Sequence, residues 1–279
     1  MTALRLGTRG SALALAQARS VAALLGEPVE LVKITTAGDV DPLHGDKSRW
    51  VGTLETALLS GDIDLAVHSA KDVPGELAPG TEIVATPRRA EPFDAVVGDL
   101  REGARVGTSA LRRRAQLLAT HPGVTVVELR GNVDTRLRKR EAGEVDTLVL
   151  AAAGLDRLGR RDAADSLLVD GVFVPAPGQG VIAVQGRVGS EASALAAAAD
   201  HPRTRAALAD ERTVVRALDA SCNTPVGVLS LEGRVRAFVG LPDGSEYVVE
   251  EAPTAEALTR RLLAAGAREL LRAAEELAR

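Results

Sequence analysis

The chain has 279 residues, of which 46% are hydrophobic and 26% charged, and its formal net charge is −4 at pH 7. This length suits two or three domains with cores of their own, and the composition is that of a globular protein. The negative charge argues against bulk attraction to nucleic acid or an acidic membrane. The N-terminus lacks the apolar stretch of a secretory signal, and no apolar run reaches the about 18 residues that a membrane span needs. We therefore expect a cytoplasmic protein that binds neither membrane nor nucleic acid.

The first third of the chain alternates between strand and helix patterns. A strand is predicted at Leu4–Leu6, followed by a helix that Ser11 caps, a strand at Val29–Ile34, a helix at Thr53–Leu59 and a strand at Ile63–Val67. This order predicts a parallel sheet with right-handed crossovers.

The same pattern then repeats. A strand at Arg105-Val106, a helix at Leu111–Ala119, a strand at Val124–Leu129, a helix at Asp134–Ala142 and a strand at Thr147–Ala151 form a second βαβαβ unit. The apolar segment Gly180–Gln185 follows this unit and is expected to return the chain to the first sheet. The two crossings predict a two-stranded hinge between two α/β lobes.

A different pattern begins near Pro202. The sequence predicts a helix at Arg203–Leu218, antiparallel strands at Val226–Leu231, Arg234–Val239 and Glu246–Val249, and a helical stretch at Ala255–Ala278. The predicted fold is thus α/β, with two lobes and a small α+β domain. The expected domains are residues 1–92 with 179–198, residues 93–178, and residues 202–279.

Lys71-Asp72 lies where the predicted strand Ile63–Val67 should reach the surface. Ligands of open α/β sheets bind at the carboxyl ends of strands, so the pair is a candidate for chemistry. Asp72 could stabilise a developing cation and transfer protons to and from a nitrogen. A simple surface ion pair is the alternative.

Arginines gather after the corresponding strands of the second unit. Arg112 and Arg113 fall in the first turn of a predicted helix that Thr108 or Ser109 could cap, where they oppose the helix dipole. Local stability therefore does not explain them, whereas a bound anion would. A solvated basic face is the alternative. Arg130 and Arg136 bracket the next helix start, and Arg9 follows the first strand. If both sheets face one cleft, these arginines would hold a ligand with several carboxylates.

Cys222 is the single cysteine of the chain. By its position alone it is best interpreted as a small buried apolar side chain, with a reactive thiol as the alternative. The four histidines are scattered, so no metal site is predicted.

Six segments together resemble the porphobilinogen deaminase family, also called hydroxymethylbilane synthase. They lie in order along nearly the whole chain and comprise His68–Pro74, Gly107–Arg113, Arg130–Arg136, Leu155–Gly159, Pro175–Gly180 and the loop around Cys222. The family joins four porphobilinogen molecules head to tail into the linear tetrapyrrole hydroxymethylbilane, releasing ammonia. Its members carry a dipyrromethane cofactor, attached to a cysteine through a thioether.

The resemblance implies a role for each candidate residue. Asp72 is the catalytic aspartate, and Cys222 anchors the dipyrromethane, against the interpretation that its position alone favours. The remaining matches are Lys71, Ser69, Thr108, Ser109, Arg112, Arg113, Arg130 and Gln179 at the cofactor, Arg9, Ser11, Arg136 and Arg157 at the substrate, and Lys47 and Trp50 in a lid. The implied partners are porphobilinogen and the growing pyrrole chain, with a monomeric protein and no metal.

Three segments depart from the family pattern. The stretch Leu43–Trp50 differs from the usual glycine-rich segment ending in Lys-Gly-x-Phe, Ala110 replaces a common serine, and Ala220-Ser221 precede Cys222. The competing interpretation is a solute-binding module, because periplasmic-binding-protein-like folds also consist of two lobes with a double crossover. That class gives no role to Cys222.

Overall fold

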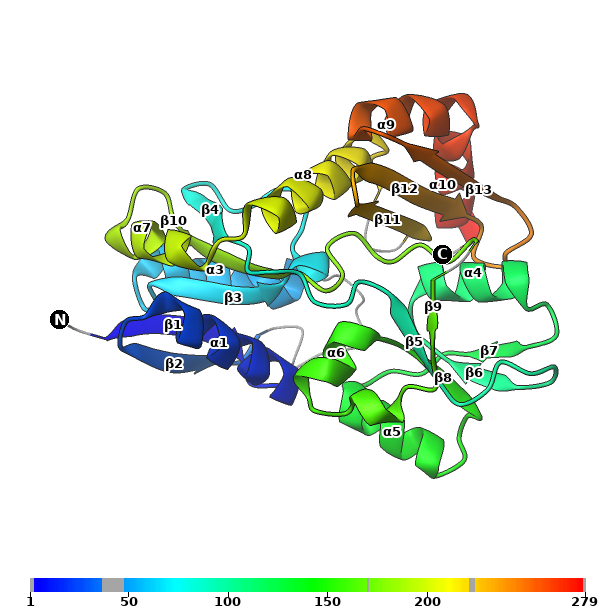
Figure 1. The fold of residues 1–279 in the computed structure, drawn as a ribbon, viewed down its shortest axis with the longest axis horizontal. Coiled ribbons are helices and arrows are strands. Elements are labelled where there is room, and N and C mark those ends of the chain that lie inside the picture. The colour runs from blue at the N-terminus through cyan, green and yellow to red at the C-terminus, as the bar shows by residue number, and fades with distance from the viewer. Residues whose placement is uncertain (1–2, 37–47, 170, 221–223, 278–279) are drawn as a thin grey trace. The chain divides into compact units, whose positions relative to one another are not determined.

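The computed structural model describes residues 3–36, 48–169, 171–220 and 224–277 (Figure 1). Contacts within the chain define two compact units. Unit 1 comprises residues 1–90 and 180–208, and unit 2 comprises residues 91–179 and 209–279. Each unit has a five-stranded sheet, and unit 2 also has a sheet of three strands.

Unit 1 has a mixed sheet with the strand order β2-β1-β3-β10-β4. Its elements are β1 (Leu4–Arg9), α1 (Ala12–Leu25), β2 (Val29–Ile34), α3 (Ser48–Ser60), β3 (Leu65–Ser69), the 3-10 turn η1 (Ala70–Asp72), β4 (Thr81–Ala85), β10 (Ile182–Arg187), α7 (Glu191–Ala196) and the 3-10 turn η3 (Ala197–Ala199). β1 is parallel to β2 and β3, whereas β10 is antiparallel to β3 and β4. The predicted return of the chain to this sheet is confirmed. The predicted parallel arrangement of the first three strands is also confirmed. The direction of the returning strand, which is antiparallel, was not predicted.

Helices cover both faces of this sheet. Val21 and Leu25 of α1 pack with Leu6 and other strand residues on one face, while Leu54 and Leu58 of α3 pack on the other. The start of α1 is as predicted, since Ser11 Oγ accepts a hydrogen bond from Ala14 N at 3.2 Å. Helices on both faces leave the strand ends as the place for polar side chains.

The first sheet of unit 2 repeats this arrangement in the order β7-β6-β8-β5-β9. Its elements are β5 (Asp94–Val97), β6 (Arg105–Gly107), α4 (Leu111–Thr120), β7 (Thr125–Val127), α5 (Val133–Glu141), β8 (Thr147–Ala151), α6 (Ala152–Arg157), the 3-10 turn η2 (Arg161–Ala163) and β9 (Ser166–Leu168). β6 is parallel to β7 and β8, and β5 is antiparallel to β8 and β9. The sequence analysis did not predict β5, β9 or α6. All three have six residues or fewer, too few to show a clear period.

The rest of unit 2 is an antiparallel sheet with helices on one face. Helix α8 (Pro202–Ala217) has its first residues in unit 1 and its last nine in unit 2. The sheet consists of β11 (Val226–Leu231), β12 (Arg234–Gly240) and β13 (Tyr247–Ala252), followed by α9 (Ala255–Ala264) and α10 (Ala267–Leu277). The expected stretch Ala255–Ala278 is two helices, because Gly266 between them has φ of 80°.

Within unit 2 the three-stranded sheet packs against α4. Ala115 of α4, Val174, Leu229 and Phe238 form one buried cluster, and Val228 N donates to Pro175 O at 2.9 Å. The residues expected in a second and a third domain thus share a contact unit. The three-domain division stays a prediction.

Candidate active site

Lys71 and Asp72 form the end of η1, directly after β3. Val73 N donates to Ala70 O at 3.1 Å and closes the turn, while Ala70 N donates to Val181 O at 3.0 Å and fixes it to the segment before β10. Both charged side chains are half-buried. The structure therefore places this pair at a strand end, on a turn held by backbone hydrogen bonds.

Ser69 and His68 point to opposite faces of the strand that leads to this turn. Ser69 is hydrogen bonded to the side chain of Gln17 on α1, with Gln17 Nε2 at 2.9 Å from Ser69 Oγ. Gln17 is buried, and the sequence analysis did not select it, because one glutamine in an amphipathic helix gives no signal.

His68 belongs to a buried polar network on the other face. Its Nε2 lies 3.0 Å from Gln185 Oε1, and Gln185 Nε2 donates to Glu55 Oε1 at 2.8 Å and to Thr81 Oγ1 at 2.7 Å. Because the Gln185 amide uses its hydrogens on Glu55 and Thr81, its oxygen must accept and His68 Nε2 must carry the proton. Burial lowers the pKa of His68 to about 4, so its ring is neutral near pH 7.

Arg9 ends β1, and its guanidinium lies over the indole of Trp50, 4.8 Å from the ring centroid. Trp50 is in the first turn of α3 and is half-buried. Ser11 lies close by in sequence, with its hydroxyl engaged as the cap of α1. The structure thus brings the predicted residues Arg9 and Trp50 together.

The arginines at the start of α4 are paired with a carboxylate of the protein itself. Arg112 Nη1 lies 2.8 Å from Asp94 Oδ2, and Arg113 Nη2 lies 2.7 Å from Asp94 Oδ1. All three side chains are at most 7% exposed, so the alternative of a solvated basic face is wrong. Asp94 supplies one negative charge for two guanidinium groups.

Asp94 stays ionised in this environment. Burial favours its neutral form, but the charges and hydrogen bonds of Arg112 and Arg113 outweigh burial and hold the pKa well below its usual value. Gln179 Nε2 also donates to Asp94 Oδ1, at 2.9 Å. The sequence analysis did not select Asp94, which lies on the short strand β5.

The predicted cap of α4 is wrong in detail. Its N-cap is Ala110, which has no side-chain cap hydrogen bond. Thr108 is buried, and its Oγ1 accepts from Ala110 N at 3.2 Å. Ser109 instead is exposed and its Oγ accepts from Arg136 Nη2 at 3.1 Å.

Arg136 lies among neutral hydrogen-bond partners. Besides Ser109, its Nε donates to Gly131 O at 2.8 Å. Burial and the charge of Arg113 lower its pKa to about 10, which means that its positive charge is incompletely compensated within the part of the chain that the structure describes. Gly131 has φ of 126°, and a Cβ there would lie 2.9 Å from Thr135 Cγ2, so the turn that positions Arg136 favours glycine.

Arg157 and Arg130 lie elsewhere in unit 2. Arg157 ends α6, is half-buried, and has its pKa lowered to about 10 by burial, with Asp156 opposing this effect. Arg130 is exposed and its Nε contacts Glu128 Oε1 at 2.7 Å, a surface pair of small energetic value. Two predicted residues, Lys47 and Cys222, lie outside the described residues.

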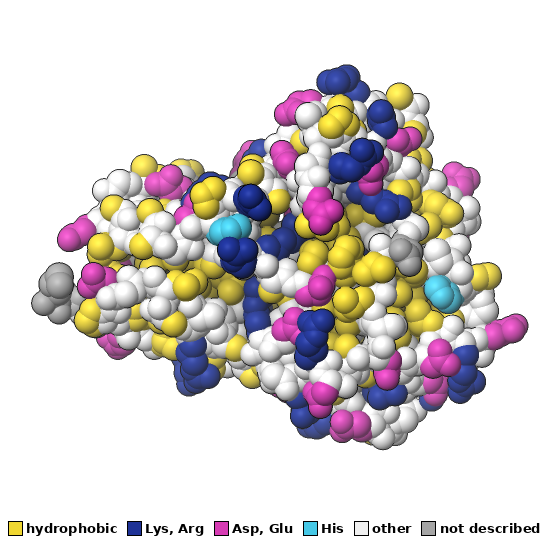
Figure 2. Space-filling view, viewed as in Figure 1, with side chains coloured by type: hydrophobic (Ala, Val, Ile, Leu, Met, Phe, Trp, Pro, Cys, Tyr) yellow, Lys and Arg dark blue, Asp and Glu magenta, His cyan; other side chains and the backbone are white. Residues whose placement is uncertain are grey.

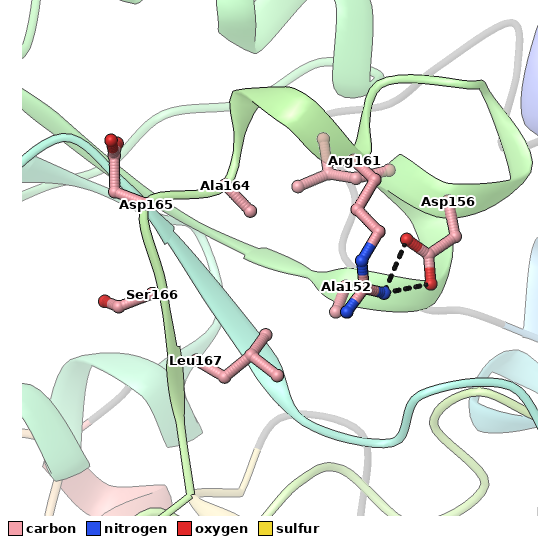
Figure 3. Close-up of a pocket in the computed structure, with 8 residues that line it drawn as sticks. Ala152, Asp156, Arg161, Ala164, Asp165, Ser166 and Leu167 are labelled. Carbon is pink, nitrogen blue, oxygen red and sulfur yellow. Dashed lines mark hydrogen bonds and ion pairs between the residues drawn. The ribbon is translucent and has the colours of Figure 1, made fainter.

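A pocket of about 180 Å³ lies beside α6 (Figure 3). In it, Arg161 Nη1 reaches Asp156 and forms hydrogen bonds of 2.9 Å to both carboxylate oxygens. Asp165, a further lining residue, accepts from Gly98 N at 2.7 Å. The Arg161 charge in this pocket is therefore paired with a carboxylate of the protein, whereas Arg136 contacts only neutral groups in the described hydrogen bonds.

The surface carries charges of both signs. On the face that Figure 2 shows, basic and acidic side chains are intermingled.

The described residues contain no cluster of three or more His, Cys, Asp or Glu that could hold a metal ion. None of the helices in the described segments is long and apolar enough to cross a bilayer.

The fold and these side chains define an α/β protein with a candidate acid at one strand end and desolvated arginines suited to carboxylates. Residues 4–195 match the family model described as "Porphobilinogen deaminase, dipyromethane cofactor binding domain". The chain is 43% identical to the porphobilinogen deaminase of Roseiflexus castenholzii, over 96% of this chain and 98% of the relative. It is 46% identical to porphobilinogen deaminase 1 of Streptomyces coelicolor, over 88% of this chain and 86% of the relative.

Solved structures with a similar fold are more distant. The periplasmic VFT2 domain of Bordetella pertussis BvgS is 16% identical, with a TM-score of 0.41, over 71% of this chain and 86% of that chain. Protein PG110 from Staphylococcus aureus is 13% identical, with a TM-score of 0.43, over 75% of this chain and 91% of that chain.

The chain belongs to the porphobilinogen deaminase family. It is an enzyme of that family, and most of its length is the family's dipyrromethane cofactor binding domain. The match to this family decides against the solute-binding module.

Proposed function

We propose that this chain condenses four porphobilinogen molecules into hydroxymethylbilane and releases ammonia. The observation that carries the proposal is the local excess of positive charge around Arg112, Arg113 and Arg136. Arg112 and Arg113 share one carboxylate, and Arg136 has neutral partners. Each porphobilinogen carries an acetate and a propionate, so a growing chain accumulates negative charge that guanidinium groups can bind in a bidentate manner.

The same excess charge fits a dipyrromethane, which has four carboxylates. When bound, this cofactor supplies the pyrrole carbon to which the first substrate is joined. We propose that Cys222 anchors it through a thioether and that Arg112, Arg113 and Gln179 lie at its carboxylate side. Such a tether turns each addition into a reaction with a positioned acceptor.

Asp72 is the proposed acid–base residue. In this proposal its carboxyl group donates a proton to the substrate's amino group, which leaves as ammonia when the C–N bond breaks. The resulting carboxylate then stabilises the positive charge on the pyrrole methylene carbon. Formation of the new C–C bond releases one proton from the acceptor pyrrole carbon, and Asp72 can take it up. The backbone hydrogen bonds of η1 support this role, because they fix the turn that carries Asp72.

The remaining assignments are also proposals. We assign Lys71, Ser69, Thr108, Ser109 and Arg130 to the cofactor side and Arg9, Ser11, Arg136 and Arg157 to the substrate carboxylates. Lys47 stays a prediction for a lid. A monomeric, cytoplasmic enzyme without a metal is the prediction for the whole protein.

Replacement of the proposed acid tests the function. In Asp72→Ala the consumption of porphobilinogen should fall by at least about 100-fold, because a general acid–base group contributes at least this factor. The matched control is Asp62→Ala, which removes an exposed carboxylate of the same unit and should turn over like the unmodified protein. Equal turnover by Asp72→Ala and the control would remove Asp72 from the mechanism.

A further inference from the structure

Trp50 carries a buried donor with no acceptor. Its indole Nε1 is shielded from solvent and has no hydrogen-bond partner among the described residues. Buried polar atoms of native proteins are nearly always hydrogen bonded, so such an atom calls for an explanation. An indole N–H can only donate. Its missing partner must therefore be an acceptor.

The surroundings of Trp50 favour an anionic acceptor. The guanidinium of Arg9 lies over the indole ring, 4.8 Å from its centroid, and its positive charge raises the local potential. Arginine near an aromatic ring is a common carboxylate-binding group, because the guanidinium keeps its full positive charge there. Arg9 and Trp50 thus present donors of two kinds from the ends of β1 and α3.

We infer that Trp50 positions both Arg9 and the substrate. The indole N–H donates to a carboxylate of porphobilinogen or of the pyrrole chain, and the ring holds Arg9 in the orientation that binds the same ligand. The inference rests on the proposed function for the identity of the ligand. It gives Trp50 two separable contributions, one from its N–H and one from its ring.

Two substitutions separate these contributions. Trp50→Phe keeps a ring beneath Arg9 and removes the N–H, so KM for porphobilinogen should rise about 10-fold with kcat changed less than about 3-fold, as expected for loss of one hydrogen bond to a charged group. Trp50→Leu also removes the ring and should raise KM about 3-fold further. A role in core packing alone would lower the melting temperature without this separation of KM from kcat.

Tyr247→Phe is the matched control, because it removes one polar group from an exposed aromatic side chain of unit 2. Its KM should equal that of the unmodified protein. If Trp50→Phe is folded and has an unchanged KM, the N–H does not bind the substrate and the inference is overturned. If Trp50→Leu and Trp50→Phe have the same KM, the part concerning Arg9 is overturned.

Fluorescence gives a readout that does not depend on turnover. Trp50 is the only tryptophan of the chain, so the tryptophan emission comes from this side chain alone. Titration of the slow variant Asp72→Ala with porphobilinogen should shift or quench the emission in a saturable manner, and an unchanged emission would overturn the inference. A protein that consumes no porphobilinogen contradicts the proposed function instead, so the two failures are distinguishable.

Discussion

The arginines of unit 2 differ in what neutralises them. Arg112 and Arg113 share the carboxylate of Asp94, whereas Arg136 contacts a hydroxyl and a carbonyl oxygen. A cation that is desolvated and repelled by a neighbouring arginine costs stability in the free protein. Such a cost is typical of groups retained for ligand binding.

Arg136→Leu tests this difference. The variant should raise KM for porphobilinogen about 10- to 100-fold, because one charge-assisted interaction is lost. It should not lower the melting temperature, because the substitution also removes a poorly compensated charge. Arg138→Leu, at an exposed position of the same helix, is the control and should leave KM unchanged. A KM for Arg136→Leu equal to that of the control would exclude Arg136 from substrate binding.

His68 should make folding depend on pH. Its pKa is lowered by burial to about 4 in the folded state and is about 6.5 in the unfolded chain. Between these values the unfolded state binds the extra proton, so this contribution to stability is complete above pH 6.5 and is lost as pH falls towards 4. From pH 7 to pH 5 the free energy of unfolding should fall by about 2 kcal/mol more in the unmodified protein than in His68→Gln. Urea unfolding at the two pH values measures this, and equal losses would show that His68 does not titrate as described.

At the residue scale, the charged residues of the candidate site could be selected from the sequence, but the residues that contact them could not. Arg9, Arg113, Arg136 and Asp72 follow strands and could be selected from that pattern. Asp94 and Gln17 could not, because an aspartate on a four-residue strand and a glutamine in a helix gain meaning only from residues far along the chain. The burial of Arg136 and its closeness to the charge of Arg113 likewise could not be predicted, because both result from the fold.

Among the elements, α8 has a structural role that its amphipathic pattern does not show. Its Glu211 is fully buried, and the carboxylate accepts from Gly178 N at 2.6 Å and from Ser230 N at 2.9 Å. One side chain therefore satisfies a backbone donor next to Gln179 and another on β11. Leaving either buried N–H without an acceptor would lower the stability of the folded protein.

Glu211→Gln should destabilise unit 2. An amide has one accepting atom in place of two, so one buried N–H loses its acceptor, at a cost of about 2 kcal/mol. Denaturant unfolding compares this variant with Glu276→Gln, an exposed glutamate of α10 that should have no effect. Identical midpoints for the two variants would contradict the role of Glu211.

Element types and order could be predicted where the sequence period is long enough. The helices after Ser11 and at Leu111–Ala119 and the strands Val29–Ile34 and Val226–Leu231 agree closely with the structure. The mixed character of both large sheets could not be predicted, because strand direction is set by the path of the chain and not by local pattern. The break at Gly266 was visible as a glycine, but its φ of 80° required the structure.

For the whole molecule, the similarity to porphobilinogen deaminases extends over nearly all of the chain. The residues by themselves indicated only an anionic ligand and a catalytic acid, and the family membership identifies the reaction. The attachment of the cofactor is the assignment on which the account depends most. By position alone Cys222 would be a buried apolar side chain, and it lies outside the described residues.

The intact mass of the purified protein tests this central claim most directly. We expect an increase equal to two porphobilinogen units less two ammonia molecules, located by peptide mapping at Cys222 and absent from Cys222→Ala. An unmodified mass should change to this value when the apo protein is incubated with porphobilinogen or hydroxymethylbilane. A protein that remains unmodified after both incubations would contradict the account.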